Sequence, residues 1–121
     1  LEFAILEIIK LAQINTVIAD LTLPIELAVE ISEYNKIACL LASPELVIRD
    51  YYDREDHKEF IECIMSLKEP DKKLETQNEL FRIGVNKTFD DVLKYDLFSI
   101  VRNENTTVDN TLPRLEKHFN L

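Results

Sequence analysis

Apolar residues recur at helical spacing along most of the chain, and short polar stretches separate the apolar segments. Within the first twenty residues one stripe has this spacing: Leu1, Ile5, Ile8, Ile9 and Ala12. Other apolar residues widen it past a single face: Phe3, Leu6, Ile14, Val17 and Ile18. A helix that is apolar over most of its girth is buried on several sides. We therefore expect a helix over 1–20 that packs against a partner or an upstream segment.

Capping signals predict where the following helices begin. Ser43-Pro44-Glu45 is the clearest, because serine accepts from free amides, proline fits the first helical position and glutamate meets the positive end of the helix dipole. Weaker start signals are Thr22 before Pro24, Asp56 before Glu59, Thr88 before Asp91 and Thr111 before Pro113. The pattern predicts helices beginning near 24, 44, 57, 71, 88 and 111, with a polar loop over 103–110. Residues 37–42 form a short apolar run. Period-two alternation does not extend beyond four residues, so no strand is predicted.

A single glycine, Gly84, excludes several nucleotide-binding and catalytic motifs. Phosphate-binding loops, dinucleotide fingerprints and the G-x-S-x-G elbow each need at least two glycines. An EF-hand is also excluded, because the matching positions before Gly84 include Phe81 and Ile83 instead of oxygen ligands. Gly84 follows the predicted helix over 71–83, where a left-handed residue commonly ends a helix. We expect a positive φ at Gly84 and a destabilising effect of Gly84→Val.

These segments predict an all-α fold, an irregular bundle of six or seven short helices in a single domain over 1–121. The chain starts at Leu1 without a methionine, which favours a fragment of a longer chain. Pro24 and Pro44 lie twenty residues apart and each opens a predicted helix. Helix pairs with proline-marked starts resemble armadillo or HEAT units, so an α-solenoid fragment is the alternative architecture.

The formal net charge of −9 narrows the class of partner. An acidic surface repels phosphate, so neither nucleic acid nor a membrane surface is an expected partner. A basic protein is favoured instead, because its charge is complementary to the electrostatic field of this chain. Charged residues interrupt the apolar N-terminal segment, which therefore does not read as a transmembrane helix.

The two cysteines, Cys39 and Cys63, lie in apolar segments and predict buried, reduced thiols in an intracellular protein, cytoplasmic or nuclear. Cys39 with His57 or His118 could form a nucleophile and base, but its apolar surroundings indicate an inert thiol.

The densest polar cluster is Asp53-Arg-Glu-Asp-His57. Asp53 and His57 are four residues apart and could present two metal ligands, with Glu62 as a third. Asp56 reads better as a helix cap, which places Asp53 outside the helix and favours a solvated loop. We therefore predict no catalytic residue, no metal ligand, no cofactor and no enzyme activity.

The adjacent tyrosines are the candidate contact with a partner, because tyrosine loses little entropy on ordering and keeps one polar end. The predicted partner-binding residues are Arg49, Tyr51, Tyr52, Asp53, Arg54 and Glu55. The leading hypothesis is a non-enzymatic regulatory or scaffold module that binds a protein or peptide through a helical face, with homo- or hetero-oligomers formed through the first helix. One alternative is a small acidic inhibitor of a basic toxin or nuclease, and another is a metal-dependent helical enzyme using Asp53, His57 and Glu62.

Overall fold

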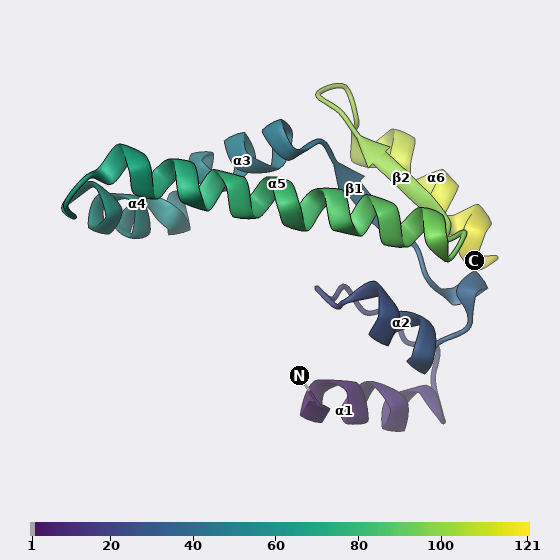
Figure 1. Cartoon of the computed structure of the whole chain (residues 1–121). Helices are drawn as coiled ribbons and strands as arrows, with labels where there is room; N and C mark the ends of the chain where they lie inside the picture. The colour runs from purple at the N-terminus through teal and green to yellow at the C-terminus, as the bar shows by residue number, and fades with distance from the viewer. Residues whose placement is uncertain (1) are drawn as a thin grey trace.

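In the computed structural model, which describes residues 2–121, helices account for most of the chain (Figure 1). The elements are α1 (Glu2–Ala12), α2 (Ile25–Ile31), the 3-10 turn η1 (Tyr34–Lys36), β1 (Cys39–Ala42), α3 (Pro44–Asp53), η2 (Glu55–His57), α4 (Lys58–Met65), α5 (Pro70–Lys94), β2 (Ser99–Arg102) and α6 (Val108–Phe119). This confirms the predicted multi-helix fold. The α-solenoid alternative gains no support, because a pair of strands interrupts the order of helices.

The two strands form a small parallel sheet that the sequence pattern did not predict. Cys39 pairs with Ser99 at one end and Ala42 with Arg102 at the other. Parallel strands need a long crossover, which α3, α4 and α5 supply here. Each strand has only four residues, too few for a period-two pattern to stand out. The helix predicted to begin near 88 therefore ends before this strand, at Lys94, and Asp96, with a φ of 51°, lies in the turn that follows it.

Helix α5 is one element of 25 residues where the pattern predicted two helices. Its inward stripe continues without a break through half-buried Phe81, Val85 and Phe89 to buried Val92. Gly84 lies inside this helix and has no positive φ, so the prediction that it ends a helix was wrong. The periodic packing on both sides of Gly84 outweighs the cost of one glycine, about 1 kcal/mol relative to alanine.

The main hydrophobic core lies where α2, β1 and α5 meet. Its buried residues are Ile25, Cys39, Leu41, Val92 and Leu97, and half-buried Val29, Ile37, Phe89 and Tyr95 pack against them. Cys39 and Leu41 alternate along β1 and so face the same side of the sheet. On β2, Ile100 is the most completely buried side chain in residues 2–121, with 2% of its surface exposed.

Two of the capping predictions concern α3 and α6. The backbone N–H of Leu46 donates to Ser43 Oγ at 3.2 Å, and Pro44 is the first residue of α3, as predicted. Helix α6 begins earlier than expected, because Thr107 and Asn110 form a reciprocal capping box. The predicted start at Thr111 was therefore wrong, and the polar loop over 103–110 is shorter.

The signals at Asp56 and Thr22 do not act as caps. Helix α4 begins at Lys58, and the Asp56 carboxylate instead accepts hydrogen bonds from the Arg54 guanidinium. Helix α2 begins after Pro24 and has no side-chain cap hydrogen bond, so Thr22 lies outside it. Local spacing predicted the first residue of both helices to within a few positions, but it did not predict whether a side chain caps their free backbone amides.

The first helix is shorter and far more exposed than the sequence predicts. It ends at Ala12 instead of near residue 20, and none of its residues is buried. Figure 1 shows α1 and α2 at the lower end of the molecule, apart from most of α5. Leu1, part of the predicted stripe, lies outside the described residues. Within residues 2–121, no helix combines the length and apolar character that crossing a membrane requires.

Candidate functional site

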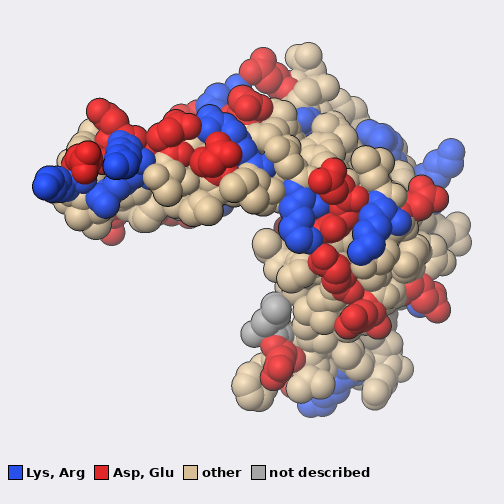
Figure 2. All heavy atoms as spheres, in the orientation of Figure 1, with Lys and Arg blue, Asp and Glu red and all other residues tan. Residues whose placement is uncertain are grey.

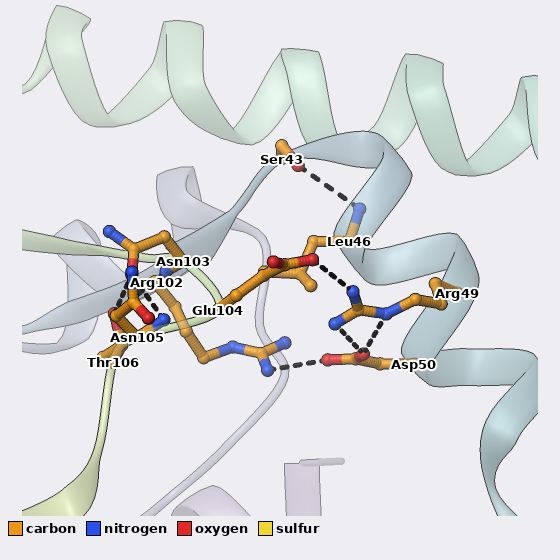
Figure 3. A network of polar contacts seen from close by, with 9 residues as sticks. All are labelled: Ser43, Leu46, Arg49, Asp50, Arg102, Asn103, Glu104, Asn105 and Thr106. Carbon is orange, nitrogen blue, oxygen red and sulfur yellow. Dashed lines mark hydrogen bonds and ion pairs between the residues drawn. The ribbon is translucent and has the colours of Figure 1, made fainter.

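A network of charged side chains lies where the two strands end, and Figure 3 shows it in detail. Arg102 ends β2, Glu104 lies in the loop that follows, and Arg49 and Asp50 lie on α3. Arg49 Nη1 donates to Glu104 Oε1 at 2.6 Å, and Arg102 Nη1 donates to Asp50 Oδ2 at 2.6 Å. The network thus ties α3 to the end of β2 and to its loop.

Asp50 is the centre of this network. Arg49 also donates to Asp50 Oδ1, from Nε at 3.2 Å and from Nη2 at 3.1 Å. Hydrogen bonds from Arg102, and then from Arg49, hold the pKa of Asp50 below its ordinary value. Hydrogen bonds to Glu104 and Asp50 raise the pKa of Arg49. Both shifts move the pKa values further from neutral pH, so both groups stay charged there. This favours ion pairing over acid–base catalysis.

A shallow groove runs past these charges. It is lined by Ser43, Glu45, Leu46, Arg49, Val101, Arg102, Asn103 and Glu104. The carboxyl ends of parallel strands, beside a helix N-terminus, are where open α/β sheets usually bind ligands. Here Ser43 Oγ accepts the Leu46 N–H, and both guanidinium groups bind carboxylates of the same chain. We therefore interpret the groove as part of the packing that holds α3 against the end of β2.

The adjacent tyrosines predicted to bind a partner are half-buried and join three helices. The Tyr51 ring centroid lies 4.0 Å from that of His57 and 4.8 Å from that of Phe81 on α5. The Tyr52 hydroxyl donates to Asn78 Oδ1, also on α5, at 2.9 Å. This pair therefore has a packing role within the chain, and a contact with a partner stays a prediction.

The other predicted partner-binding residues flank the tyrosines in the chain, and most of them make ion pairs of their own. Arg49 belongs to the charged network, whereas Asp53, Arg54 and Glu55 are exposed around the end of α3. Arg54 Nη2 lies 2.6 Å from Asp56 Oδ2, and Glu55 pairs with Lys58. These ion pairs are local in sequence and exposed, so the corner they form is a solvated turn.

The candidate metal ligands do not assemble. Across residues 2–121, no group of three His, Cys, Asp or Glu side chains is placed to hold a metal ion, so Asp53, His57 and Glu62 do not form one. His57 Nδ1 lies 2.7 Å from the Tyr51 carbonyl oxygen, which occupies that ring nitrogen. These three side chains are therefore not arranged as one metal site, and the alternative of a metal-dependent enzyme gains no support from them.

The candidate nucleophile and base are also engaged elsewhere. Cys39 is buried on β1, and burial raises the pKa of its thiol, as expected for an inert side chain. His118 Nε2 lies 2.8 Å from the Ile37 carbonyl oxygen, and its ring stacks on Phe98 at 4.1 Å. Cys63 is exposed on α4, so its predicted burial was wrong.

The most distinctive surface is the apolar one near the N-terminus. We call the exposed large apolar side chains of this segment the N-terminal apolar surface: Phe3, Leu6, Ile9, Leu11, Ile14, Ile18 and Leu21. Phe3 is 85% exposed and Ile14 is 81% exposed. In Figure 2 the lower part of the molecule, where α1 and α2 lie, is mostly uncharged, whereas the far end of α5 is densely charged. Single exposed apolar residues are common, but such a series in one segment is typical of an interaction site.

Comparisons with protein-family models, with curated proteins and with solved structures find no match to this chain. Fold alone does not define an activity, so the function has to be inferred from the exposed surfaces and the chemistry they present.

Proposed function

We propose that this chain is a non-enzymatic interaction module that binds another polypeptide through the N-terminal apolar surface. One observation carries the proposal: seven large apolar side chains between residues 3 and 21 are exposed in a chain that buries its core elsewhere. Water contact with such a series is unfavourable, and a partner that covers it removes that cost.

The size of the exposed surface is in the range that binding requires. Phe3, Ile14 and Ile18 each keep more than 70% of their surface in water. Full burial of one such side chain contributes about 1.5–3 kcal/mol. Three of them therefore supply several kcal/mol towards association, before the costs of ordering and lost mobility are subtracted.

The first helix also benefits from being covered. Isolated helices shorter than about 12 residues are marginal in water. Helix α1 has 11 residues and none is buried, so packing within this chain supplies little of its stability. A partner that packs on α1 would stabilise the helix and gain the apolar contact together.

The test separates a binding surface from part of the fold. In the double variant Phe3→Ser/Ile14→Ser we expect the fluorescence of a bound apolar dye to fall by about half or more, because two of the most exposed apolar groups are removed. The urea midpoint should stay within error, because neither side chain is buried. Leu93→Ser is the matched control, since Leu93 is 78% exposed on α5, outside this surface.

Two results would contradict the proposal. If the double variant unfolds at clearly lower urea than Leu93→Ser, the surface is needed for folding instead of binding. If the dye signal is the same in the wild type and in both variants, the apolar residues are not accessible as one surface.

A further inference from the structure

We infer that the segment bound at the N-terminal apolar surface is a basic amphipathic helix, an inference that rests on the proposed function. The charge of the surrounding residues carries it. Residues 2–35 contain one basic side chain, Lys10, against six acidic ones: Glu2, Glu7, Asp20, Glu26, Glu30 and Glu33. With one basic and six acidic side chains, residues 2–35 carry a formal charge of −5, more than half of the net charge of −9.

Half of these acids have a cation of the same chain close by. Lys10 Nζ lies 3.9 Å from Glu7, Lys87 lies 2.8 Å from Glu26, and Lys36 lies 3.0 Å from Glu33.

The other three acids are available to a partner. Glu2, Asp20 and Glu30 are exposed, and none of them forms an ion pair with another residue of 2–121. An apolar surface with unpaired carboxylates around it is complementary to an apolar face flanked by lysine or arginine.

The part of this surface on α1, which carries Phe3, Leu6, Ile9 and Leu11, favours a helix over an extended strand as the occupant. The backbone amides and carbonyls of α1 are used inside the helix, so α1 offers no free ladder of hydrogen bonds to an added strand. An amphipathic helix binds through side chains alone, with apolar positions three and four residues apart and charges beside them. The 11 residues of α1 span about 16 Å, enough to cover about three turns of a partner helix.

A second copy of the chain is a poorer occupant. A symmetric dimer brings the same patch together from both copies, so each unpaired acid would face a surface of equal charge. The net charge of −9 on each copy adds long-range repulsion. A basic helix converts the same carboxylates into attractive pairs.

The experiment uses three synthetic peptides of about 18 residues, five helical turns, that share one leucine face. Their polar faces carry lysine, glutamine or glutamate. Anisotropy titrations with the whole chain at low salt should rank the affinities as lysine, then glutamine, then glutamate. We expect about tenfold between the first and the last, as three exposed ion pairs would give. The advantage of the lysine peptide should shrink as salt is added.

Two variants assign the contributions to the two kinds of side chain. Glu2→Gln/Asp20→Asn/Glu30→Gln should reduce the difference between the peptides while the glutamine peptide keeps its affinity. Phe3→Ser/Ile14→Ser should weaken all three peptides, whereas the control Leu93→Ser should bind as the wild type does.

The possible failures can be told apart. If all three peptides bind equally and Phe3→Ser/Ile14→Ser weakens them, the interaction surface stands and the basic partner is overturned. If no peptide binds, or if the serine variant binds as tightly as Leu93→Ser, the proposed function fails as well. Sedimentation of the chain alone as a dimer that Phe3→Ser/Ile14→Ser dissociates would show that the occupant is a second copy.

Discussion

Ile100 offers the sharpest test of how β2 packs into the hydrophobic interior of the chain. It lies in the middle of β2, in register with Leu40 of β1, and only 2% of its surface is exposed. The next residue, Val101, is also β-branched and belongs to the same strand, but 53% of its surface is exposed. The two positions therefore share strand propensity and differ in burial.

The cost of Ile100→Ala follows from the carbons it removes. Three buried carbons at about 0.8 kcal/mol each account for roughly 2.4 kcal/mol of lost transfer free energy. The cavity left behind brings the loss of unfolding free energy to about 3 kcal/mol, inside the usual range for this substitution. Ile100→Val removes one carbon and should cost about 0.5–1.5 kcal/mol. Val101→Ala should cost less than about 1 kcal/mol, mainly through strand propensity.

Urea unfolding followed by circular dichroism at the helical band measures all three variants. We expect the midpoints to fall in the order Val101→Ala, Ile100→Val, Ile100→Ala, with unchanged slopes. The milder Ile100→Val keeps the test usable if the alanine variant does not fold. Equal losses for Ile100→Ala and Val101→Ala would falsify the placement of Ile100 in the core and the sheet register with it.

Four further substitutions or labelling tests check other parts of the structure. Gly84→Ala should raise the free energy of unfolding by about 0.5–1 kcal/mol, because Gly84 is helical and nothing lies within 4 Å of an added Cβ. A lower midpoint temperature in thermal melts of this variant would show that the position requires glycine. Ser43→Ala should cost about 1 kcal/mol through the lost cap of α3, and Ser43→Asp should retain most of the stability. Asp50→Asn should destabilise the chain at pH 7 and less so in acid. The folded pKa of Asp50 is lowered, so its contribution is complete above its ordinary pKa of 3.8 and is lost as the pH falls below that value; a difference in urea midpoint that stays constant down to pH 2 would argue against the ion pairs. In the folded chain a thiol reagent should label Cys63 rapidly and Cys39 only with unfolding, as mass spectrometry of the single Cys→Ser variants would show.

Helices were predictable here wherever a local signal and a continuous apolar stripe agreed. Ser43-Pro44 marked the start of α3 because the cap uses groups only three residues apart. The break predicted at Gly84 failed because glycine and a Thr-x-x-Asp pattern also look like a boundary in sequence. In the structure Thr88 Oγ1 donates back to the Gly84 carbonyl at 3.0 Å, inside α5. The stripe from Phe81 to Val92 was the more reliable signal, because it reflects packing over the whole helix.

The strands were not predictable, because their hydrogen bonds join residues about sixty positions apart. Cys39–Ala42 has the apolar character of a helix segment as much as of a strand. Its backbone forms strand hydrogen bonds only by pairing with Ser99–Arg102. A run of four residues is too short to show the period-two pattern that would predict such a strand.

The candidate sites show the same division between local and long-range information. Arg49 could be singled out in the sequence as a charged residue beside two tyrosines, but its partner Glu104 lies 55 positions away, across the crossover. The candidate metal ligands are not grouped together for a related reason. Four-residue spacing holds two side chains on one helix face only if the helix is continuous, and the chain leaves α3 after Asp53 and turns at η2 before α4 begins. The N-terminal apolar surface is the opposite case, because its composition is local and was visible at once. Its exposure could not be predicted. A helix that is apolar around most of its circumference is expected to pack against another segment, but the pattern does not tell whether that segment belongs to the same chain.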